Sequence, residues 1–73
     1  MKTLYLRYYP LFGWYLSSAD TLFDVKTRYF RKGEKRLFES TPTWFGTKEE
    51  AREAAEEMGF KVVEIEMVER KVE

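Results

Sequence analysis

The segment from residue 47 to residue 60 constrains the fold most strongly, because it predicts a helix whose beginning and end are both marked. Residues 47–50 read TKEE, a capping box in which the Thr47 hydroxyl accepts a hydrogen bond from the Glu50 amide and the Glu50 side chain reaches back. Gly59 suits the left-handed position after the last turn, and Phe60 can pack back against that turn. We therefore predict one helix over about residues 48–58.

The buried face of this helix predicts what must lie opposite it. Ala51, Ala54, Ala55 and Met58 recur at helical spacing and form one apolar stripe. Alanine lets a helix approach its neighbour closely but supplies little volume, so the facing layer must provide large side chains. Residues 1–46 hold all but one of the aromatic residues of the chain, and we expect them to supply that layer as a sheet.

Alternating residue types predict strands on both sides of the helix in the sequence. The first strand covers residues 3–9, and a shorter one at 14–18 follows a turn at PLFG, residues 10–13. In the first strand we expect Leu4, Leu6 and Tyr8 to pack under the helix, with Thr3, Tyr5, Arg7 and Tyr9 on the opposite face. In the final strand, about residues 61–70, we expect Val63, Ile65 and Met67 to point inward and Glu64, Glu66, Val68 and Arg70 outward.

Residues 21–31 fit either a strand or a helix. Asp20 as a cap and Gly33 as a stop would favour a helix. Their β-branched and aromatic residues favour a strand, which is our prediction. Lys32 and Gly33 would then form a tight turn into a strand over residues 35–40, with Thr27 opposite Phe38.

Together these elements predict an α+β fold, with a small, mainly antiparallel sheet of four or five strands and one short helix packed on one face. Seventy-three residues form a single domain, 1–73, with an aromatic β-rich segment at 1–46 before the helix and the final strand. The other face of the sheet would have no helix to cover it. That face is where we expect an interaction surface.

The chain contains no cysteine, histidine, asparagine or glutamine. The commonest general base, the thiol nucleophile and the usual zinc ligands are therefore missing. The serines lie at turns or strand ends, and paired acids such as Glu64 and Glu66 are typical of a solvated strand face. We therefore expect no catalytic site, no metal and no cofactor, and hence no enzyme.

Composition also bears on where such a chain works. No apolar run approaches the roughly 20 residues of a membrane span, so we expect no membrane partner. The absence of cysteine is compatible with the cytoplasm, where we expect the protein to reside. Charged residues make up 36% of the chain, and with the missing thermolabile residues this composition resembles that of thermophile proteins.

Charge is distributed unevenly along the chain, although the formal net charge is zero. Residues 1–46 carry eight basic and four acidic groups, whereas residues 47–73 carry five basic and nine acidic groups. Six of the basic groups lie between residues 26 and 36, on the expected hairpin. Alternation along that hairpin would place Lys26, Arg28 and Lys35 on one face and Arg31 and Arg36 on the other. The candidate contacts to phosphate or to an acidic partner are Arg28, Arg31, Lys32, Lys35 and Arg36.

Rings on the uncovered face of the sheet are the second candidate site. Tyrosine, tryptophan and arginine often anchor protein interfaces, and rings can also stack on bases. The candidate residues are Tyr5, Arg7, Tyr9, Tyr15 and Phe30. We expect a non-enzymatic interaction module that binds a protein partner, or itself, through this face and its charged ends. The alternative is a nucleic-acid-binding protein that uses the basic hairpin 26–36.

In its size and single-helix design the chain resembles many small α+β proteins encoded by phages and other mobile elements. These include inhibitors of host nucleic-acid enzymes such as CRISPR effectors. The resemblance rests on residues 1–73 as a whole and on no motif. It implies one further alternative, a phage-type inhibitor that binds a host nucleic-acid enzyme.

Overall fold

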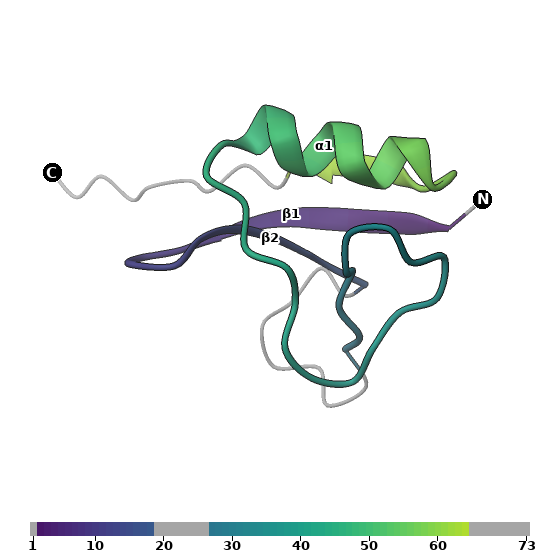
Figure 1. Ribbon diagram of the computed structural model, residues 1–73, viewed down its shortest axis with the longest axis horizontal. Helices are drawn as coiled ribbons and strands as arrows, with labels where there is room; N and C mark the ends of the chain where they lie inside the picture. Colours follow the sequence, from purple (N-terminus) through teal and green to yellow (C-terminus); the bar gives the residue numbers. More distant parts are fainter. Residues whose placement is uncertain (1, 19–26, 65–73) are drawn as a thin grey trace, which may run out of the picture.

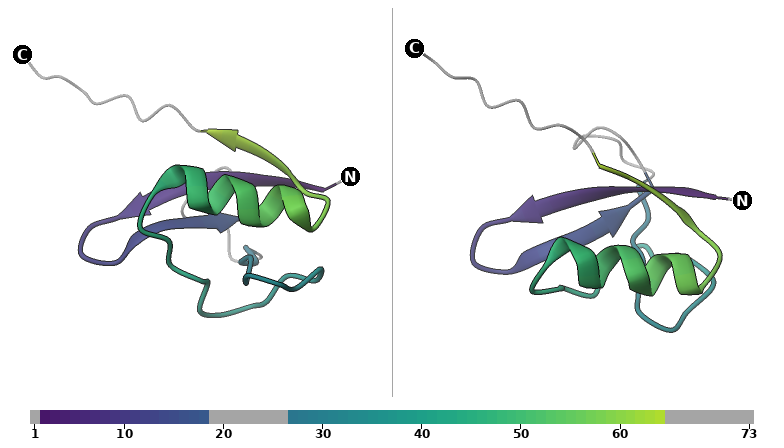
Figure 2. Two further views of the ribbon diagram at one scale, coloured as in Figure 1. Left: turned by 45° about the horizontal axis from the view of Figure 1, so that its top comes forward. Right: turned by 90° about the horizontal axis from the view of Figure 1, so that it is seen from above.

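The computed structural model describes residues 2–18 and 27–64, which form one small sheet covered by one helix (Figure 1). The elements follow the chain as β1 (Thr3–Tyr9), β2 (Gly13–Ser17), α1 (Lys48–Glu57) and β3 (Lys61–Glu64). The strand order is β2-β1-β3, with β2 antiparallel and β3 parallel to β1. Figure 2 shows α1 lying along one face of this sheet. The α+β character predicted from the sequence is therefore confirmed.

The sheet is smaller and more mixed than predicted. Within residues 2–18 and 27–64 it has three strands rather than four or five, and β3 runs parallel to β1. Two further segments reach the outer edge of β2, but each makes only a single bridge there, at Trp14–Phe45 and at Ser17–Tyr29. Both segments pair with the same strand, β2, which has only five residues. Neither segment can therefore form a regular series of backbone hydrogen bonds with it.

The predicted turn at Lys32 and Gly33 is present. The Glu34 amide donates to the Arg31 carbonyl over 3.0 Å, and Gly33 has a φ of 83°. The predicted register after the turn is wrong, because Phe38 lies opposite Tyr29 rather than Thr27. Bends at residues 35 and 36 lengthen the second arm and shift the pairing. The part of the predicted strand before residue 27 lies outside the described residues.

Large side chains from the sheet side fill the core beneath an alanine face, as predicted. Ala51 and Ala55 of α1 are completely buried, and Ala54 is nearly so. The ring of Phe30 lies at the centre, 6.4 Å from the Phe45 ring and 5.6 Å from the Phe60 ring, measured between centroids. The other buried apolar residues are Leu4, Leu6, Leu16 and Val62.

The facing of β3 differs by one residue from the prediction. Parallel pairing places Val62 opposite Leu4, so Val62 is buried under the helix and Val63 points to the other face. Glu64 has the same parity as Val62 and therefore lies on the α1 side of the sheet, where its side chain stays exposed to solvent and accepts from Arg52. The predicted positions from residue 65 onward lie outside the described residues.

Both predicted helix ends are confirmed. The Glu50 amide donates to the Thr47 hydroxyl over 3.2 Å, and the Glu50 carboxylate accepts from the Gly46 amide, one residue before the cap. At the other end Gly59 has a φ of 90°, and the Phe60 amide donates to the Ala55 carbonyl over 3.1 Å. This is a Schellman motif, in which Phe60 turns back into the core.

Candidate interaction surface

Five aromatic rings gather on the face of the sheet opposite α1. Leu4 and Leu6 point to the helix, so the odd-numbered residues of β1 point away from it, and Tyr15 lies level with Arg7 on that same face. The ring centroid of Trp44 lies 5.0 Å from that of Tyr15, in an edge-on contact. The set, here called the aromatic surface, consists of Tyr9, Phe12, Tyr15, Tyr29 and Trp44.

Backbone bridges at the edge of β2 bring the distant rings to this surface. The Phe45 amide donates to the Trp14 carbonyl over 2.8 Å, and the Phe30 amide donates to the Leu16 carbonyl over 3.1 Å. Each bridged segment is extended, so when Phe45 and Phe30 point into the core their preceding residues point the other way. Those preceding residues are Trp44 and Tyr29. Figure 1 shows the chain between residues 27 and 46 passing beside β2 toward the side of the sheet away from α1.

The turn between β1 and β2 presents an exposed apolar tip. The Phe12 amide donates to the Tyr9 carbonyl over 3.1 Å, with Pro10 second and Leu11 third in the turn. Leu11 has a φ of 78° and is 98% exposed. Proline second and a positive φ third are typical of a type II turn, whose third residue is normally glycine or asparagine. The hairpin projects beyond the end of α1 (Figures 1 and 2).

A shallow groove of about 400 Å³ runs along the aromatic surface. It is lined by four rings of the aromatic surface, Tyr9, Tyr15, Tyr29 and Trp44, and by residues 39–42. Burial raises the pKa of the Tyr15 hydroxyl above its ordinary value, an effect that Arg7 partly opposes. Like any tyrosine hydroxyl at neutral pH, that of Tyr15 can donate a hydrogen bond.

The structure brings together only some of the predicted interaction residues. Tyr9 and Tyr15 both contact Trp44, whereas Tyr5 lies farther along the face, level with Ser17 and Val63. Arg7 lies level with Tyr15 and is half-buried. Phe30 was predicted to contact a ligand, but it is completely buried in the core, where its ring reaches no ligand.

Sequence reasoning missed Phe12, Tyr29 and Trp44 as members of the surface. The signal for two of them is a pair of adjacent rings, Tyr29 with Phe30 and Trp44 with Phe45, in short extended segments. In such a pair one ring faces the core and its neighbour faces away. The bridges to β2 decide which ring of each pair faces the core. These bridges join residues far apart in the sequence, so the sequence does not reveal them.

The basic residues around the turn at Lys32 have different neighbours. Arg28 pairs with Glu39 at 3.5 Å. Arg31 and Arg36 place their guanidinium carbons 4.2 and 4.6 Å from the centre of the Phe38 ring. Lys32 lines a second hollow together with four glutamates of α1: Glu50, Glu53, Glu56 and Glu57. Lys35 is exposed. Arg28 and Lys32 thus have acidic neighbours, whereas Arg31 and Arg36 share one aromatic ring.

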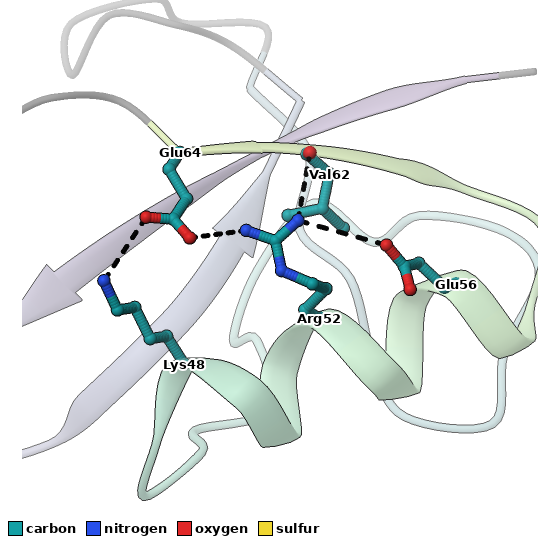
Figure 3. A network of polar contacts seen from close by, with 5 residues as sticks. All are labelled: Lys48, Arg52, Glu56, Val62 and Glu64. Carbon is teal, nitrogen blue, oxygen red and sulfur yellow. Dashed lines mark hydrogen bonds and ion pairs between the residues drawn. The ribbon is translucent and has the colours of Figure 1, made fainter.

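An ion-pair network joins α1 to β3 (Figure 3). The Arg52 guanidinium donates to the Glu64 carboxylate and also lies 3.9 Å from Glu56. The Lys48 ammonium donates to the other oxygen of Glu64 over 3.3 Å. The hydrogen bond from Arg52, followed by that from Lys48, lowers the pKa of Glu64 below its ordinary value. Since these side chains hold helix and strand together, we assign the network a structural role.

Among residues 2–18 and 27–64, no group of three or more acidic side chains gathers in a way that could hold a metal ion. Nor does that part of the chain contain a helix with the length and apolar character needed to cross a membrane. Comparison of the chain with models of protein families, with curated proteins and with solved structures found no match.

Proposed function

We propose that this protein is a non-enzymatic interaction module that binds a protein partner through the aromatic surface and the Leu11 tip. The observation that carries the proposal is the combination of conformation and exposure at Leu11. A left-handed backbone costs a leucine about 1–2 kcal/mol, and its side chain, at 98% exposure, gains nothing from packing within the chain. A partner that covers the leucine would supply the missing apolar contact.

The rings beside the tip support the same function. Phe12 stacks on Tyr9 with 5.4 Å between centroids, and both side chains are about half exposed, at 56% and 51%. Aromatic side chains already held by their neighbours lose little conformational freedom when they bind. Tyrosine and tryptophan are also among the side chains that contribute most to protein interfaces.

Nucleic-acid binding by the hairpin 26–36 is the alternative, and the contacts of the described basic residues support it less. Arg31 and Arg36 lie on Phe38, and Lys32 lies beside the acidic helix. A binder of phosphates normally collects its cations along one groove or face. A phage-type inhibitor of a host nucleic-acid enzyme is a special case of the proposed function, in which the protein partner is that enzyme.

Photo-crosslinking in living cells tests the proposal directly. A photoreactive phenylalanine analogue replaces Phe12 on the aromatic surface, and in a matched control it replaces Glu49 on the exposed side of α1. We expect a discrete crosslinked protein from position 12 that resists nuclease, and none from position 49. A band at twice the mass of the chain would indicate self-association, and light scattering of the purified protein would check it.

Equal crosslinking from both positions would contradict the proposal. So would a crosslink at position 12 that disappears after nuclease treatment, because nucleic acid would then bridge the two proteins.

A further inference from the structure

We infer that the groove binds a proline-rich segment of the partner in the polyproline II conformation, with a basic residue beside the prolines. This inference rests on the proposed function and narrows the chemistry of the partner. The rings that line the groove have a shape that suits proline. Trp44 and Tyr15 meet at 63° with their centroids 5.0 Å apart, which forms a notch between two ring surfaces. Pyrrolidine rings pack well in such aromatic notches.

The row of rings also has a suitable length. From Tyr9 to Trp44, Tyr15 and Tyr29 the successive centroid separations are 5.9, 5.0 and 6.1 Å. A polyproline II helix rises about 3.1 Å per residue with three residues per turn. The row therefore spans no more than about two turns of such a helix, enough for two proline contacts on one side of the peptide.

The polar atoms of the groove complement a proline-rich backbone. Within the part of the chain that the structure describes, the hydroxyls of Tyr9, Tyr15 and Tyr29 and the indole nitrogen of Trp44 make no hydrogen bond. All four groups can donate. Proline lacks an N–H, so a proline-rich backbone offers mainly carbonyl acceptors, and a groove lined with donors matches it.

Charge complementarity selects the flanking residue. Glu39 is the charged residue among those that line the groove, and its side chain is 80% exposed. Its ion pair with Arg28 is long, at 3.5 Å, and exposed pairs of this kind are weak. A basic residue of the peptide can therefore share the Glu39 carboxylate while the prolines occupy the rings.

The test is an NMR titration of the isotope-labelled protein with capped synthetic peptides. The probe is nine prolines followed by arginine, and the matched control has nine alternating glycines and serines before the same arginine. We expect saturable shifts at the Trp44 indole and the Tyr9 and Tyr29 amides, with a dissociation constant below about 1 mM, and no saturation with the control.

Three variants locate the site and its charge preference. We expect Trp44→Ala to weaken binding of the proline peptide at least tenfold. Tyr8→Ser should leave it unchanged, because Tyr8 has the same exposure as Tyr9, 52% against 51%, but lies on the other face of β1. If Trp44→Ala fails to fold, Glu39→Gln still tests whether the peptide binds in the groove. It should remove the preference for the arginine peptide over one ending in glutamate.

The inference is overturned if the proline peptide produces no saturable shift up to about 5 mM, or shifts only residues away from the groove. Saturation of the same rings by single-stranded oligothymidine, or shifts that depend only on protein concentration, would also overturn it in favour of nucleic acid or a second copy. The proline peptide could cause no saturable shift while position 12 still gives a nuclease-resistant crosslink. That result would rule out the proline-rich ligand but would still support the proposed function.

Discussion

Leu11 and Gly13 lie two residues apart and both have a positive φ, which favours glycine, yet only residue 13 is glycine. Gly13 has a φ of 112°, and a Cβ there would lie 2.5 Å from the Phe45 carbonyl oxygen, so the fold requires glycine. At Leu11 the fold would accept glycine equally well, because the side chain is 98% exposed. The fold therefore explains Gly13 but not Leu11, for which the proposed function offers a partner that covers the side chain.

Replacing Leu11 separates stability from binding. We expect Leu11→Gly to raise the free energy of unfolding by about 0.5–1 kcal/mol, since relief of the left-handed strain exceeds the added chain entropy of glycine. The melting temperature should rise by about 2–6 °C, while recovery of the partner should fall. Leu11→Ala keeps the strain, so it should weaken binding without stabilising the fold. Partner recovery equal to wild type in both variants would contradict a binding role for Leu11.

Gly13→Ala tests the close approach of residue 45 to β2. We expect a loss of at least about 2 kcal/mol in denaturant unfolding, because the new methyl group meets the Phe45 carbonyl in an already strained conformation. Gly33→Ala is the matched control. Its φ of 83° is also positive, but a Cβ there has no neighbour within 4 Å, so only the conformational cost of about 1 kcal/mol should remain. Equal losses in the two variants would contradict the contact.

At the scale of elements, the features predicted best from the sequence are those set by residues close together in the chain, such as helix caps and turns. The cap at Thr47 and the turn at Gly33 follow from local chemistry and were correct. The facing of β3 was wrong by one residue, because it depends on whether Val62 or Val63 lies opposite Leu4 in a parallel pair. Nothing within residues 61–64 decides that question, since both valines fit a buried position.

The contact between α1 and β3 predicts a pH dependence. The folded-state pKa of Glu64 is lowered by its hydrogen bonds to Arg52 and Lys48, so the ionised form stabilises the fold above the ordinary pKa of 4.5. That contribution is lost as the pH falls through the lower folded value. Glu64→Gln should therefore unfold more easily than wild type at pH 7, with a small difference that vanishes in acid. A difference that is constant down to pH 2 would contradict the assignment.

On the scale of the whole molecule, the two faces of the sheet carry different kinds of side chain. One face packs large apolar side chains against the alanines of α1. The other carries the aromatic surface, of which alternation in the sequence predicted Tyr9 and Tyr15. Trp44 and Tyr29 could not be assigned from the sequence, because they arrive through bridges to β2 from residues at least 12 positions away in the chain.

The most direct measurement compares partner recovery between matched surface variants. The tagged protein is expressed in its source cells, captured after nuclease treatment, and the recovered protein partner is quantified by mass spectrometry. We expect recovery to fall at least tenfold for Tyr9→Ser combined with Trp44→Ala, and to stay at the wild-type level for Tyr8→Ser. Equal recovery with all three proteins, or loss of the partner on nuclease treatment alone, would contradict an aromatic surface that binds protein.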